Sequence, residues 1–383
     1  MPEQEEEESE LMQYSPAGEG VRLDHVEFFV ADAAAHAALM VDKFGFRVCG
    51  TAGLGEEGTA RSVAVSQGDA VIVFTQGLEE EHPAAVYVTR HGDGVGGITL
   101  RVDDVRAVFA HAVANGATVV EEPVDLVDDV VETTAVIGGF GDVVHRLVQP
   151  APGADARGVL LPGFAAASGA DALAASERGI VRGIDHFAVC LEADGLVPAA
   201  EFYRRALGFR EIFEERIIVG GQAMISKVMQ NATHDVTFTL IEPDLSAQPG
   251  QIDAFLKDHG GAGVQHIALA AGDIVGTVGD LASRGIGFLT TPGTYYDMLG
   301  DRLSPEAYTV EQLKGLGILA DEDHGGQLFQ IFAKSTHPRR TFFWEVIERL
   351  GAKSFGTRNI KALYEAIARD QEQAHPARDG GRA

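Results

Sequence analysis

The chain has 383 residues, of which 45% are hydrophobic and 23% charged, a composition typical of a globular protein large enough for two domains. Its 57 acidic and 30 basic residues give a formal net charge of −27, which argues against binding to nucleic acid or to an anionic membrane. With two cysteines, no long apolar stretch and no basic-then-apolar leader, the sequence favours a reduced, cytoplasmic setting.

Composition divides the chain into five segments. Residues 1–20 form an acidic tail that is expected to be disordered, because its like charges cannot be buried. Residues 21–150 are predicted to form an N-terminal, non-catalytic domain. Residues 151–179 are a linker rich in Ala, Gly, Pro and Ser, with only residues 159–164 apolar enough to dock. A C-terminal catalytic domain over 180–372 and a disordered end over 373–383 follow.

The two domains repeat one pattern. Residues 23–47 are answered by residues 184–210, and residues 94–100 by residues 263–269. Each repeat begins with a strand, continues with a helix and ends with several alternating strands, so the unit is predicted to be βαβββ, with two units in each half.

Two helices can be placed more closely. One should run from about Pro198, which suits a first turn, to Leu207, with Gly208 just past its end. The other lies within residues 359–370, where apolar side chains recur at helical spacing.

Three ligand-type side chains follow the repeat. His186, His266 and Glu345 each lie in a short apolar run with strand character. Any one of them alone would be read as a core histidine or a surface carboxylate, but two imidazoles and one carboxylate form the facial triad of non-haem Fe(II) oxygenases. Gly97 stands where His266 would be expected in the first half, so His25 lacks a partner and is predicted to be structural.

The motifs at residues 261–266, 330–332, 341–345 and 355–359 resemble the 4-hydroxyphenylpyruvate dioxygenase family, and the resemblance runs from about Arg22 to Asp370. It implies an α+β vicinal-oxygen-chelate fold, with two domains of paired βαβββ modules forming open barrel-like sheets and a C-terminal helix as a lid. It also implies one Fe(II) per chain, 4-hydroxyphenylpyruvate and O2 as substrates, and neither a nucleic-acid nor a membrane partner. A homo-oligomer stays open.

The resemblance also implies pocket residues. Gln330 is expected to hydrogen-bond the substrate or an intermediate, and Phe343 to share the face of Glu345 as an aromatic wall, although core packing would explain Phe343 equally well. The other expected substrate contacts are Ser226, Thr239, Ile241, Phe355, Asn359 and Tyr364. Ser226 and Thr239 could instead be ordinary strand hydroxyls. Gln265 is expected to support the structure rather than bind metal, and His145, His259 and His324 to be surface or loop residues.

One departure from the family pattern bears on the product. The homogentisate-forming members resemble Pro-x-Asn where this chain has Thr239-Leu-Ile241, so an amide near the substrate ring is replaced by a branched alkyl group. The resemblance therefore favours oxidative decarboxylation and benzylic hydroxylation to 4-hydroxymandelate and CO2. Two alternatives remain: formation of homogentisate, and a non-catalytic protein that binds small ligands.

Overall fold

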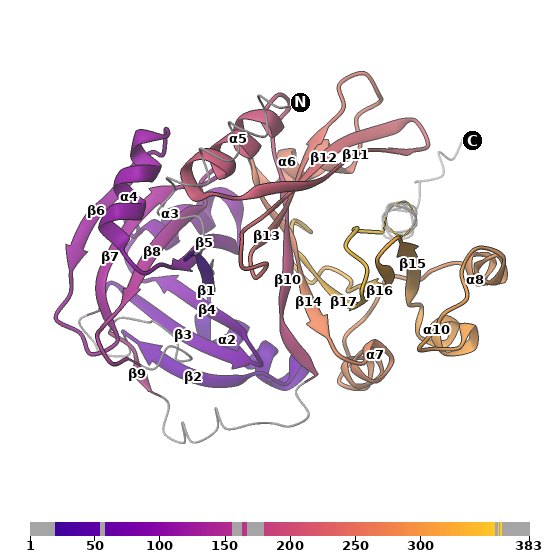
Figure 1. Cartoon of the computed structure of the whole chain (residues 1–383). Coiled ribbons are helices and arrows are strands. Elements are labelled where there is room, and N and C mark those ends of the chain that lie inside the picture. Colours follow the sequence, from indigo (N-terminus) through magenta and orange to yellow (C-terminus); the bar gives the residue numbers. More distant parts are fainter. Residues whose placement is uncertain are drawn as a thin grey trace, which may run out of the picture.

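The computed structural model describes residues 20–53, 58–154, 163–166 and 180–356, together with Asn359 and Lys361. Two curled sheets lie side by side, the first built from the N-terminal half and the second from the C-terminal half (Figure 1). Almost all of the acidic tail, most of the linker, Tyr364 and the end of the chain lie outside the described residues.

The first sheet contains two βαβββ units. Its strands are β1 (Arg22–Phe29), β2 (Arg47–Ala52), β3 (Ala60–Gln67), β4 (Ala70–Gly77), β5 (Gly94–Arg101), β6 (Val119–Asp125), β7 (Val131–Gly138), β8 (Val144–Pro150) and the short β9 (Ala165–Ala166). Its helices are α2 (Ala33–Leu39), the π-helix η1 (Met40–Phe44), α3 (Pro83–His91) and α4 (Val105–Ala114). The strand order is β6-β7-β8-β5-β1-β4-β3-β2-β9.

The second sheet repeats this plan with strand order β11-β12-β13-β10-β14-β17-β16-β15. Its strands are β10 (Val181–Cys190), β11 (Arg210–Val219), β12 (Gln222–Gln230), β13 (Thr237–Pro243), β14 (Gly263–Ala271), β15 (Leu319–Asp323), β16 (Gly326–Phe332) and β17 (Phe343–Leu350). Its helices are α5 (Leu196–Leu207), α6 (Gln251–His259), α7 (Ile274–Ser283), α8 (Gly293–Asp297), α9 (Leu299–Arg302) and α10 (Val310–Leu316).

The first strands of the two units meet at the centre of each sheet. β1 pairs antiparallel with β5, and β10 pairs antiparallel with β14. The predicted βαβββ repeat and the vicinal-oxygen-chelate architecture are thereby confirmed. The helix predicted from Pro198 begins two residues earlier, at Leu196, and ends as expected before Gly208, whose φ of 71° gives the left-handed conformation that glycine tolerates best.

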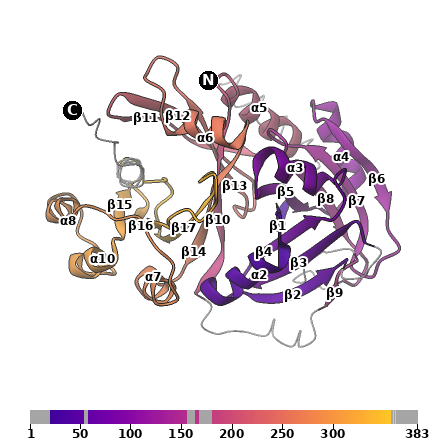
Figure 2. The ribbon, with the colours of Figure 1, turned by 180° about the vertical axis from the view of Figure 1, so that it is seen from behind.

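The halves share one hydrophobic core. It includes Ile98 and Leu147 from the first sheet and Tyr203 and Phe238 from the second half. Helices and strands of the two halves also contact each other: α4 packs against α5, α3 against α6, and β4 against β10. The view from behind shows the same boundary between the halves (Figure 2). From the predicted docking run, Phe164 packs beside Ala64 and Val73 of the first sheet.

Two histidines that were expected at the surface lie in this boundary. His145 on β8 is fully buried, and its Nε2 atom lies 2.7 Å from the Tyr203 hydroxyl of α5. His259 ends α6 and stacks between His91 and Phe255, with ring centroids 4.4 and 5.0 Å away. The prediction was wrong for both because it considered each half separately. His324 is exposed in the turn between β15 and β16, as predicted.

Candidate metal centre

His186, His266 and Glu345 come from β10, β14 and β17, three adjacent strands in the middle of the second sheet. The register pairs Ala188 with His266, and Ala268 with both His186 and Glu345. Since paired residues point to one face of a sheet and alternate residues share that face, the three side chains converge. Glu345 Oε2 lies 3.6 Å from His186 Nε2 and 3.3 Å from His266 Nε2.

This arrangement fits a metal ion. Each residue offers one ligand atom, and these atoms lie within 4.8 Å of one another. Two ligand atoms that each lie about 2.1 Å from one ion, at a right or tetrahedral angle, are separated by about 3.0–3.5 Å. The distances of 3.6 and 3.3 Å from Glu345 Oε2 to the two histidine nitrogens are close to this range. Burial lowers the pKa of His266 although the nearby Glu345 opposes this effect, which favours the neutral imidazole that metals bind.

The outer nitrogens of both histidines have polar partners. His186 Nδ1 lies 2.8 Å from the Asp185 carboxylate, and His266 Nδ1 lies 3.3 Å from the side-chain oxygen of Gln265. These oxygens accept hydrogen bonds, so a proton on Nδ1 of each ring would satisfy them and would leave the lone pair of Nε2 for a metal. Gln265 therefore supports a ligand candidate rather than adding one.

A chain of amides leads away from Glu345. Gln330 Nε2 on β16 donates to Glu345 Oε1 over 3.0 Å, and Asn359 Nδ2 donates to Gln330 Oε1 over 3.1 Å. The Tyr295 hydroxyl of α8 donates to Asn359 Oδ1 over 2.9 Å. Gln330 and Asn359 thus lie together beside the carboxylate. Tyr295 links them to α8, a helix that was not predicted from the sequence.

Two aromatic side chains flank the histidines. Phe343 stacks on the His266 ring with centroids 4.8 Å apart, and Phe355 meets the His186 ring edge-on at 5.0 Å. Both are buried. Phe343, the predicted aromatic wall, and Phe355, an expected substrate contact, therefore lie beside the two histidines of the metal-type site.

Three more of the predicted pocket residues, Ser226, Thr239 and Ile241, share this face of the sheet. Thr239 pairs with Ala188, and Ile241 with Ser226. The Thr239 hydroxyl is buried without a hydrogen-bond partner among the described residues. Ile241 packs with Ala188 in a small apolar cluster, whereas the Ser226 hydroxyl donates to the Glu215 carbonyl over 3.4 Å.

Asp185 and Arg349 were missed from the sequence. Arg349 Nε and one terminal nitrogen donate to the two oxygens of Asp185, over 2.8 and 2.9 Å. Burial opposes ionisation of the Asp185 carboxyl, but the hydrogen bond with His186 and the charge of Arg349 outweigh burial and hold its pKa well below the ordinary range. The Asp-His pair that recurs in both halves was the signal that could have identified Asp185.

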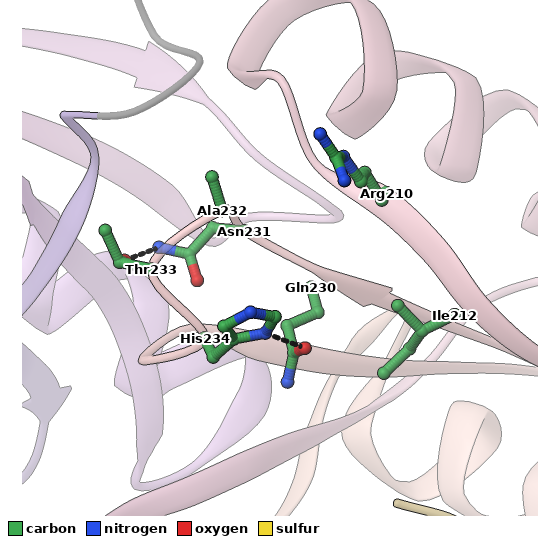
Figure 3. A pocket seen from close by; sticks show the side chains of 7 residues that line it. All are labelled: Arg210, Ile212, Gln230, Asn231, Ala232, Thr233 and His234. Atoms are coloured by element: carbon green, nitrogen blue, oxygen red, sulfur yellow. Dashed lines mark hydrogen bonds between the residues drawn. The ribbon is translucent and has the colours of Figure 1, made fainter.

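A separate hollow of about 370 Å³ lies at the turn between β12 and β13 (Figure 3). Residues 230–234 line it together with Arg210 and Ile212, and none of the three ligand candidates does. Within the described residues, no helix is long and apolar enough to cross a membrane.

Comparison with known proteins agrees with this fold. The family model of the Glyoxalase/Bleomycin resistance protein/Dioxygenase superfamily matches residues 22–142 and 183–331. The paired modules therefore define a protein of the vicinal oxygen chelate class, and its second sheet carries a His-His-Glu cluster that could hold a metal ion.

Relatives narrow this class. The 4-hydroxyphenylpyruvate dioxygenases of Neurospora crassa and Xenopus tropicalis are each 34% identical to this chain; the first alignment covers 91% of both chains, the second 93% of this chain and 92% of its relative. The chain belongs to the 4-hydroxyphenylpyruvate dioxygenase family. It is also similar to a mutant of 4-hydroxymandelate synthase from Streptomyces coelicolor, at 39% identity and a TM-score of 0.83, over 92% of this chain and all of that structure.

Proposed function

We propose that the protein is an Fe(II)-dependent enzyme that converts 4-hydroxyphenylpyruvate and O2 to 4-hydroxymandelate and CO2. One oxygen atom enters the carboxylate that forms as CO2 leaves, and the other forms the benzylic hydroxyl, so the substrate supplies the electrons itself. The likeness to 4-hydroxymandelate synthase at 39% identity over 92% of the chain supports this product.

His186, His266 and Glu345 would hold one Fe(II) per chain. Bound iron would supply O2 activation and a chelation site for the α-keto acid, because three facial protein ligands leave three adjacent positions open. Gln330 keeps the Glu345 carboxylate in place by donating to its Oε1 atom, and its own oxygen is engaged by Asn359. Fixing the carboxylate in this way holds the other oxygen, Oε2, toward the two histidines.

The aromatic residues would confine the substrate ring. Phe343 and Phe355 lie against the two histidine rings, so they limit the volume beside the ligands and exclude water from it. Tyr364, which lies outside the described residues, is proposed to contribute to the same aromatic wall. Ser226 on β12 is proposed to line the pocket beside Ile241. These roles leave the chemistry to the triad and orientation to the surrounding side chains.

The observation that carries the choice of product is the environment of Thr239 and Ile241. Ile241 is 7% exposed and offers only alkyl surface, and the Thr239 hydroxyl is buried with no partner in the part of the chain that the structure describes. A buried hydroxyl without a partner is costly, and a substrate phenol or a bound water would satisfy it. A ring held by Thr239 rather than by an amide at position 241 would take another orientation relative to the iron site.

Product analysis tests the proposal. Purified protein loaded with Fe(II) is given 4-hydroxyphenylpyruvate under air, and the aromatic products are separated by chromatography. We expect 4-hydroxymandelate with release of one CO2 per O2 consumed. Homogentisate as the main product would contradict the choice of reaction, and binding without turnover would favour a ligand-binding protein.

Two cysteines without a disulfide among the described residues agree with a cytoplasmic location, which we include in the proposal.

A further inference from the structure

A partly buried ion pair lies directly behind His186, the first ligand candidate. The Asp185 carboxylate lies 2.8 Å from His186 Nδ1, and its two oxygens accept from Arg349 over 2.8 and 2.9 Å. The pair is two-pronged and largely shielded from water, since the side chains of Asp185 and Arg349 are 14% and 21% exposed. Such a geometry fixes the carboxylate in one orientation.

Arg349 also binds the loop that follows β17. Its third nitrogen donates to the Ser354 carbonyl over 2.5 Å, and its guanidinium lies 4.7 Å from the centre of the Phe355 ring. Phe355 in turn packs edge-on against His186. Arg349 therefore joins the loop after β17 to the carboxylate behind His186, so the histidine ring is held from behind and from one side.

The N-terminal half contains a matched assembly that belongs to no metal-type cluster among the described residues. His25 Nδ1 lies 2.7 Å from Asp24, and Arg101 lies 2.6 Å from the other oxygen of Asp24. There the Thr99 hydroxyl lies 3.0 Å from His25 Nε2, within hydrogen-bond distance, whereas the residue paired with His186 at the corresponding register is Ala268. A methyl group at this position leaves the lone pair of His186 Nε2 available to a metal.

We infer that Asp185 and Arg349 are positioning residues for the metal centre. Asp185 selects the Nδ1–H tautomer of His186 and fixes the ring so that Nε2 faces Glu345, and Arg349 fixes Asp185. The inference rests on the proposed metal site, but not on which product the enzyme forms. Carboxylates that orient a ligating histidine in this way typically raise metal affinity by about 10- to 100-fold.

The test compares two equivalent substitutions, Asp185→Asn and Asp24→Asn. Each removes the charge of one carboxylate that is paired with a histidine and an arginine and is shielded from water wholly (Asp24) or largely (Asp185), and only Asp185 is next to a ligand candidate. Co(II) is titrated into the metal-free full-length proteins, its binding is followed by visible absorption, and thermal stability is measured without metal. We expect Asp185→Asn to weaken Co(II) binding at least tenfold, and Asp24→Asn to bind as the unchanged protein does, with comparable losses of thermal stability.

Equal Co(II) affinity in Asp185→Asn and the unchanged protein would overturn the inference, and so would an equal loss in Asp24→Asn, since that loss would reflect stability alone. Should Asp185→Asn fail to fold, Arg349→Lys is titrated in the same way, and undiminished affinity would again overturn the inference. The tautomer of His186, read from its ring-nitrogen NMR shifts in the unchanged metal-free protein, needs no variant, and a proton on Nε2 would contradict the assignment. Homogentisate formation with the expected affinities would contradict only the proposed function.

Discussion

Replacing Ile241 with Asn should move part of the product from 4-hydroxymandelate toward ring-oxidised species. Ile241 shares the inner face of the second sheet with Thr239 and Ser226, and it offers the substrate ring no polar contact. An amide at this position would compete with the Thr239 hydroxyl for the phenol. The same amide would change the distance between the benzylic carbon and the iron site, where a displacement of about 1 Å can change a rate by orders of magnitude.

The size of the effect follows from the strength of one hydrogen bond. A neutral hydrogen bond contributes about 0.5–1.5 kcal/mol, and 1.36 kcal/mol corresponds to a factor of ten, so the ratio of products should change by about two- to tenfold. The fold should bear the change. Losing the alkyl surface of Ile241 costs about 2 kcal/mol, and burying an amide about 1–3 kcal/mol more, against a typical total stability of about 5–15 kcal/mol.

The assay separates products from aerobic turnover and measures urea unfolding of the same preparations. Ile241→Val is the matched control, because it shortens the side chain without adding a polar group; it should keep the original product and lose about 1 kcal/mol of stability. If Ile241→Asn is active with an unchanged product ratio, position 241 does not select the product. If the unchanged protein forms homogentisate, the proposed reaction is wrong.

Three further outcomes are expected. Glu345→Ala should abolish iron binding and activity while the fold persists, and near-normal iron content would refute the ligand assignment. Deleting residues 1–20 should leave turnover and thermal stability nearly unchanged, because a tail so rich in glutamate cannot be buried, and a large loss of activity in folded protein would show that the tail contacts the enzyme. Burial lowers the pKa of His145 from 6.5 to about 4, so between these pH values the unfolded chain binds the extra proton and stability falls as pH falls, by on the order of 3 kcal/mol. Urea unfolding of His145→Gln should show a shallower dependence over this range, and an unchanged slope would contradict the assignment.

Much of the fold was accessible from the sequence because it is repeated. A strand that carries an Asp-His pair and is followed by a helix and alternating strands occurs in both halves, so a pattern too weak to interpret once became reliable when it recurred. The nearness of His186, His266 and Glu345 followed from the same repeat, since equivalent positions in equivalent strands point to one face.

What the sequence could not provide was the packing between distant segments. His145 contacts Tyr203 and His259 contacts His91, each across the boundary between the halves, and neither contact can be read from the strand or helix that carries the histidine. The partnership of Asp185 with Arg349 joins residues 164 positions apart through a strand register that includes bulges. The contact of Gln330 with Asn359 likewise depends on where the segment after β17 returns.

The common core assigns the first half of the molecule a task that its side chains alone do not suggest. A single apolar cluster contains Ile98 and Leu147 from the first half and Tyr203 and Phe238 from the second. Each half therefore shields apolar side chains of the other from water. A destabilising change near Ile98 would then reduce the number of competent molecules in the cell and leave the turnover of each survivor intact. In a survey of variants, inactivity caused by damaged chemistry should therefore map to the second sheet, whereas inactivity caused by low abundance should map to both sheets.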